Sequence, residues 1–211
     1  MEAARPFHES ANATHPSLVD PSHRLVELFG ITNVPFALWV DESGRIVRPA
    51  EVAFLPREPQ AGSADQEQSL ARILEQLPPE RRAIVEAMTR NSSSVDRTKY
   101  VDALRDWVAN GPRSAYVLSA DDVIGRSRPR PADAALAAAH FEIGQHLHRA
   151  GSRLDAVPHF EAAHRLDPEN WSYPRQAYSL VDASMGNPYD TDLLAEVARV
   201  GVDTFYPALD I

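Results

Sequence analysis

Residues 15–49 read HPSLVDPSHRLVELFGITNVPFALWVDESGRIVRP, and short apolar runs alternate with turn residues throughout this stretch. The runs typical of β-strands lie at 17–20, 35–40 and 45–47. Helices are expected over 2–11 and 23–29, on either side of the first run. Because Asp41-Glu42-Ser43-Gly44 separates the last two runs, they are predicted to form an antiparallel hairpin.

Two positions in this stretch have special backbone requirements. Gly44 can take the positive φ that a short hairpin with a bulge demands. Pro35 follows Val34 at the start of the apolar run FALWV, where a proline must either lie at the edge of a sheet or carry a cis bond. We predict that the Val34–Pro35 peptide bond is cis.

The order of these features resembles the C-terminal part of a thioredoxin-like domain of the TlpA- and ResA-type redoxins. In that family a strand, a helix ending in a Phe-Gly-Ile element, a Val-Pro dipeptide and an Asp-x-x-Gly hairpin follow one another. The resemblance implies that Pro35 is the family's cis-proline, which flanks the thiol site and shapes the substrate-peptide groove. Gly44 matches the hairpin glycine.

The sequence also departs from this family. It has no cysteine, which excludes thiolate nucleophiles, disulfides and Cys-ligated metals. The βαβ unit that carries the family's CxxC pair has no counterpart before 17–20. Two explanations stay open: a truncated chain, or a remnant whose exposed strand edge pairs with a partner or a second copy.

Composition narrows the function classes further. The formal net charge is −9, which disfavours binding to nucleic acid. No apolar run is long enough to span a membrane and the first residues lack the order of a secretory signal, so a cytoplasmic protein is expected.

Proline-rich breaks divide the chain into successive parts. We predict a partial thioredoxin-like segment (1–53), a linker (54–64), a helical connector (65–126) and a helical domain (127–211). Helices of the connector are expected at 66–77, 79–90, 97–110 and 120–126. Asn91–Asp96 is predicted to be a loop that caps the following helix.

Residues 137–170, AAAHFEIGQHLHRAGSRLDAVPHFEAAHRLDPEN, resemble one 34-residue tetratricopeptide repeat, abbreviated TPR. The resemblance implies two antiparallel helices that cross at small residues, with His140 replacing the usual large aromatic. Because a single hairpin cannot bury its own apolar face, the helices at 97–110 and 171–181, or the N-terminal part, are expected to cover it. The matching positions are Gly144, Ala156, Phe160, Ala163 and Pro168.

The sequence thus predicts an α+β/α fold: a partial thioredoxin-like β-α-β-β segment, then a mainly α-helical domain with one TPR-like helical hairpin. No residue is assigned to catalysis, to a cofactor or to a metal. His140 and His148 lie too far apart along one helix to share an ion, and His159 and His164 face different ways. The basic run 126–130 is expected to be a solvated linker.

Three functions remain from this reasoning, and one of them is an unrelated enzyme built on His and carboxylate residues in an unfamiliar arrangement. The favoured one is a non-catalytic scaffold that binds a protein partner or itself through an exposed sheet edge, with no role for nucleic acid or membrane. The alternative is a truncated redoxin-family oxidoreductase or antioxidant relative whose catalytic half is missing.

Overall fold

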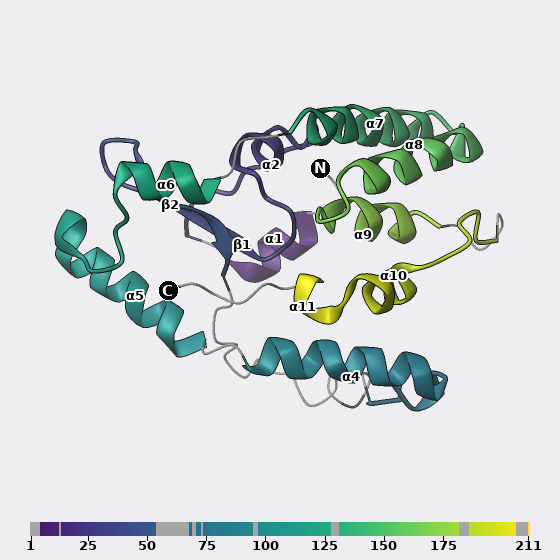
Figure 1. Cartoon of the computed structure of the whole chain (residues 1–211), viewed down its shortest axis with the longest axis horizontal. Helices are drawn as coiled ribbons and strands as arrows, with labels where there is room; N and C mark the ends of the chain where they lie inside the picture. Colours follow the sequence, from purple (N-terminus) through teal and green to yellow (C-terminus); the bar gives the residue numbers. More distant parts are fainter. Residues whose placement is uncertain are drawn as a thin grey trace.

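The computed structural model describes residues 5–12, 14–53, 68, 71–72, 74–94, 97–127, 131–181, 186–205 and 211. In this part of the chain the fold is mixed α+β, with helices around a two-stranded antiparallel sheet (Figure 1). The predicted linker over 54–64 and much of the predicted helix 66–77 lie outside the described residues.

The N-terminal part contains the predicted helices and hairpin. Its elements are α1 (Arg5–Ala11), α2 (Arg24–Phe29), β1 (Phe36–Val40) and β2 (Ile46–Val52). In the turn, the Asp41 carboxylate accepts hydrogen bonds from the backbone N–H groups of Ser43 and Arg45, and Gly44 has φ 81°. These bonds fix the register in which β1 and β2 pair.

The predicted strand over 17–20 is wrong, because these residues form no strand and no helix. Leu18 and Val19 are 83% and 57% exposed, so the apolar pattern does not reflect burial here. Asp20 instead binds the start of α2, since its carboxylate accepts the N–H groups of Arg24 and Leu25 at 2.9 and 2.6 Å. Without a neighbouring strand, residues of high β propensity gain nothing from an extended backbone.

The connector is helical, as predicted. Its described helices are α4 (Pro79–Ser94), α5 (Arg97–Asn110), the short η2 (Gly111–Arg113) and α6 (Ala120–Ser127). The predicted loop from Asn91 is wrong up to Ser94, because α4 continues through it. The amide of Asn91 donates to the carbonyl of Val202 at 3.3 Å, and this tertiary contact replaces a local turn. Residues 95–96 lie outside the described part.

A first core joins the sheet to α5. Trp39 is 2% exposed, stacks on Trp107 with ring centroids 4.9 Å apart, and donates its indole N–H to the Tyr100 hydroxyl at 3.0 Å. The side of α5 that packs against the sheet therefore carries Tyr100 and Trp107, whereas Val108 of the same helix is 82% exposed.

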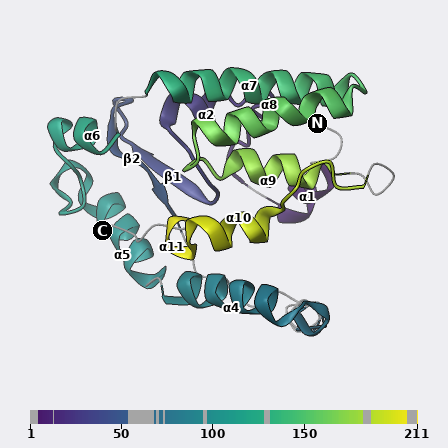
Figure 2. The same cartoon turned by 45° about the vertical axis from the view of Figure 1, so that its right-hand side comes forward.

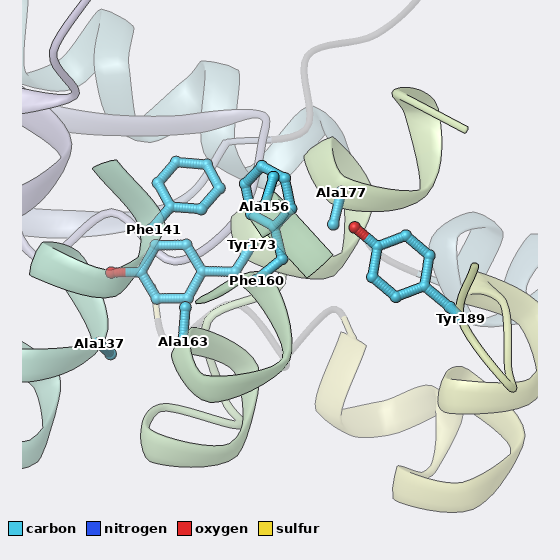
Figure 3. Packing of buried hydrophobic residues seen from close by; sticks show 8 residues of the cluster. All are labelled: Ala137, Phe141, Ala156, Phe160, Ala163, Tyr173, Ala177 and Tyr189. Carbon is cyan, nitrogen blue, oxygen red and sulfur yellow. The ribbon is translucent and has the colours of Figure 1, made fainter. Parts of the chain in front are cut away.

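The helical domain begins with the predicted hairpin. It contains α7 (Ala132–Arg149), α8 (Arg153–Leu166), α9 (Ser172–Ser179), α10 (Leu193–Val200) and α11 (Val202–Phe205). Figure 3 shows the second core, where Phe141, Phe160 and Tyr173 meet between α7, α8 and α9. The helix expected over 171–181 thus covers the hairpin, whereas the helix expected over 97–110 packs against the sheet.

A third core fastens the end of the chain to the connector. Trp171 packs edge-on against Phe205, with ring centroids 5.0 Å apart, and both contact Val197 of α10. Figure 2 shows the resulting order of helices, with α10 and α11 between α9 and α4. No helix in the described part combines the length and apolarity that a bilayer crossing requires.

Candidate functional site

The seven positions taken from the two resemblances have structural roles. The Val34–Pro35 bond is cis, as predicted, and Gly44 occupies the turn of the hairpin. Of the repeat positions, Gly144, Ala156, Phe160 and Ala163 are buried between α7 and α8, whereas Pro168 is exposed after α8. The structure therefore brings four of these positions together as packing residues and leaves Pro35 and Gly44 at the sheet.

The loop before Pro35 is held by the chain's own C-terminal helices. Asn33 is 2% exposed; its amide donates to the carbonyl of Phe205 at 2.6 Å, and its side-chain oxygen accepts from Arg175 at 2.6 Å. Val34 donates its N–H to the same Asn33 oxygen at 2.9 Å, and its carbonyl accepts from Arg175 at 3.4 Å. Both backbone groups of Val34 thus have intramolecular partners.

This arrangement matters for the groove that the redoxin resemblance implies beside the cis-proline. A peptide that paired with the backbone of Val34 would first have to displace Arg175 and Asn33. Since Asn33 would then be left buried with unsatisfied polar atoms, such pairing carries a free-energy cost.

A different hollow lies between the N-terminal part and the hairpin. It has a volume of about 500 Å³ and is formed by α2 and the loop after it, both strands, the start of α7 and the turn before α9. We call it the interdomain groove. Its apolar side chains include Val26, Leu28, Phe29, Ile31, Leu38 and Ile46.

The groove combines an apolar lining with carboxylates. Glu27, Asp167 and Glu169 line it, and none of its described lining residues is Lys, Arg or His. Leu28 is 61% exposed and Ile46 36% exposed, so part of the apolar lining is open to solvent. Residues 128–130 of the basic run, which adjoin the groove in sequence, lie outside the described residues.

Histidines make contacts that sequence spacing missed. His23 Nδ1 lies 2.6 Å from a carboxylate oxygen of Glu142, and this contact joins the segment before α2 to α7. His140 and His159 face each other with their Nδ1 atoms 3.0 Å apart, although the sequence analysis gave His159 no role. The spacing of histidines along one helix does not predict these pairs, because each pair joins residues on two different segments of the chain.

The third such contact joins α8 to α10, where His164 lies 3.1 Å from Glu196. Within the described ranges, no three or more His, Asp or Glu side chains are grouped to hold one metal ion. The three histidine contacts bridge different elements of the fold.

Comparisons with known proteins found no matching family model, no matching curated protein and no matching solved structure. The thioredoxin-like and TPR-like resemblances consequently stay predictions from the residues that carry them.

Proposed function

We propose that this chain is a non-catalytic interaction scaffold that binds an extended segment of a partner protein in the interdomain groove. The observation that carries the proposal is the groove itself, a hollow of about 500 Å³ whose apolar lining is partly open to solvent. Exposed contiguous apolar surface rimmed by polar groups is typical of protein-binding sites.

Charge indicates the chemistry of the partner. The chain carries a formal net charge of −9, and carboxylates of Glu27, Asp167 and Glu169 line the groove. A partner segment that alternates apolar and basic side chains would bury its apolar face and meet a favourable potential. Two copies of this chain would repel each other, so the proposed partner is a different protein.

The sheet edge forms the second part of the proposal. In the described part of the chain, β1 has only β2 as a strand neighbour. The other side of β2 is partly occupied, because the N–H of Leu118 donates to the carbonyl of Val47 at 3.1 Å. We propose the outer edge of β1 as a place where an extended partner strand adds to the sheet.

The absence of cysteine supports the non-catalytic part of the proposal, since thiol redox chemistry has no nucleophile in this chain. The engaged backbone of Val34 supports it as well, because Asn33 and Arg175 already occupy the position that the redoxin resemblance implies for a bound peptide beside Pro35.

The test uses two fluorescent 12-residue peptides of equal length, one alternating Leu with Lys and one alternating Leu with Glu. We expect the Leu/Lys peptide to bind in fluorescence anisotropy titrations and Leu28→Asn to weaken it by about tenfold, or about 1.4 kcal/mol. Val108→Asn is the matched control, because Val108 is 82% exposed on α5 and does not line the groove.

Two results would contradict this function: no saturable binding of the Leu/Lys peptide, or binding that Leu28→Asn and Val108→Asn change equally. Sedimentation equilibrium of the chain alone tests self-association, and a mass that rises with concentration and falls in Leu28→Asn would replace the heterologous partner with a second copy.

A further inference from the structure

A second hollow lies within the helical domain and shares no lining residue with the interdomain groove. It has a volume of about 460 Å³, is open to solvent on one side, and is lined by α8, α9, residues 189–191 and α10. Its wall is aromatic: Tyr178 and Tyr189 meet edge to face with ring centroids 5.2 Å apart, and Phe160 lies beside them. We call it the tyrosine pocket. This volume falls in the range of small-ligand sites.

A buried carboxylate faces this aromatic wall. The side chain of Glu196 is only 10% exposed, and its contacts all converge on one oxygen, Oε2. That atom accepts from His164 at 3.1 Å and from two nitrogens of Arg199 at 3.1 and 2.8 Å. Among the described residues, nothing donates to Oε1, so half of this carboxylate keeps its capacity to accept hydrogen bonds.

The distribution of charge favours a cation in the tyrosine pocket. Carboxylates of Glu161, Asp190 and Glu196 line it, against the guanidinium groups of Arg165 and Arg199. Arg199 is 62% exposed and already bonds Glu196, so it lies at the rim, while the Glu196 carboxylate is buried. A bound anion would have to approach this carboxylate, whereas a cation would complete its hydrogen bonds.

The pKa values of the two tyrosines reflect the same negative charge in the pocket. Burial raises the pKa of Tyr178 to about 12, and the negative charges of Glu196, Asp192 and Glu161 add to the effect. The pKa of Tyr189 is raised as well, first by burial and then by Tyr178 and Glu161. Both phenols therefore stay neutral near pH 7.

We propose that the tyrosine pocket binds an organic ammonium ion, with the ring faces of Tyr178 and Tyr189 against its alkyl groups and Glu196 Oε1 accepting its N–H. This chemistry combines a cation–π contact with a charge-assisted hydrogen bond. A free primary amine and the side chain of a lysine present the same group. The inference is independent of the proposed scaffold function, because the two hollows are lined by different residues.

Isothermal titration calorimetry of the full chain tests this proposal with n-butylammonium, n-butanol and n-butyrate, which share size and differ in charge. We expect saturable binding of n-butylammonium only. A further titration with Nα-acetyl-lysine amide, whose side-chain ammonium is free, distinguishes a lysine side chain from a free amine as the natural ligand. Binding tighter than that of n-butylammonium indicates a lysine side chain, and weaker binding indicates a free amine. Equal or tighter binding of n-butyrate would overturn the proposal.

Variants assign the binding to this pocket. Glu196→Gln and Tyr178→Leu should each weaken n-butylammonium by at least about tenfold, whereas Tyr178→Phe keeps the ring and most of the affinity. Glu80→Gln, in the exposed first turn of α4, is the control and should bind like the parent chain. Should Glu196→Gln fail to fold by circular dichroism, the comparison of Tyr178→Leu with Tyr178→Phe decides. Equal affinities of those two variants would contradict the site.

Discussion

A β-carbon on Gly144 would lie 2.8 Å from the Cε1 atom of Phe160, so α7 and α8 are in contact through a ring and a bare backbone. We predict that Gly144→Ala destabilises the fold. The added methyl group costs about 1–3 kcal/mol through overpacking, which exceeds the gain of about 1 kcal/mol from replacing glycine within a helix. Urea unfolding followed by circular dichroism measures the difference.

The matched control is Gly125→Ala on α6, where a β-carbon meets no atom within 4 Å and φ is not positive. We expect this variant to stabilise the chain by up to about 1 kcal/mol, because alanine has the higher helix propensity. Equal shifts of the urea midpoint at Gly144 and Gly125 would show that the close crossing does not exist.

The second prediction concerns Asn33, which bridges the cis-proline loop to Arg175 and to the carbonyl of Phe205. Asn33→Ala should cost about 1–3 kcal/mol, because it leaves a buried carbonyl and a guanidinium without their partner. A double-mutant cycle with Arg175→Ala should be non-additive, whereas Asn33→Ala combined with the distant Gly125→Ala should be additive. Additivity in both cycles would contradict the bridge.

Gln145 provides a prediction of opposite sign. Its side-chain nitrogen is buried on α7 without a hydrogen-bond partner among the described residues. Methionine has a similar volume and no donor to satisfy, so Gln145→Met should stabilise the chain by about 1 kcal/mol. Gln176→Met on the partly exposed side of α9 is the comparison, with an expected change below about 0.5 kcal/mol. Loss of stability in Gln145→Met, measured by thermal unfolding, would indicate that the amide is satisfied.

Acid stability should depend on Glu196. Burial raises the pKa of its carboxyl, but hydrogen bonds and charge from Arg199 and His164 outweigh burial and hold the pKa below its ordinary value of 4.5. Such a group contributes stability that is complete above the unfolded pKa and is lost as the pH falls through the folded pKa. We therefore expect Glu196→Gln to lose less stability than the parent chain between about pH 7 and about pH 3. Parallel urea titrations at the two pH values measure this, and an unchanged difference would contradict the pKa direction.

The hairpin and its packing residues could be predicted from the sequence because helix crossings impose fixed spacings on small and large side chains. Gly144, Ala156, Phe160 and Ala163 satisfy that spacing, and the structure buries all four. The hairpin turn at Gly44 could be predicted from the sequence as well, because the backbone conformation that it requires is set by neighbouring residues.

The predictions that were wrong concern features that depend on contacts between residues far apart in the sequence. Leu18 and Val19 match a strand pattern, yet no neighbouring strand pairs with them in the described structure. Asn91 matches a loop, yet a contact with Val202 keeps it in α4. The two hollows could not be predicted from the sequence for the same reason, since their walls combine segments separated by many residues.

The hydrogen bond between Asn33 and the carbonyl of Phe205 joins residues 172 positions apart. It therefore cannot form until the ribosome has synthesised the whole stretch between them. A ribosome adding about 5–20 residues per second needs on the order of 10–30 s to make that stretch. Throughout this interval the nascent loop before Pro35 lacks its C-terminal anchor. The emerging N-terminal segment is consequently exposed to chaperones and proteases for longer than the helical hairpin, whose two helices emerge one after the other.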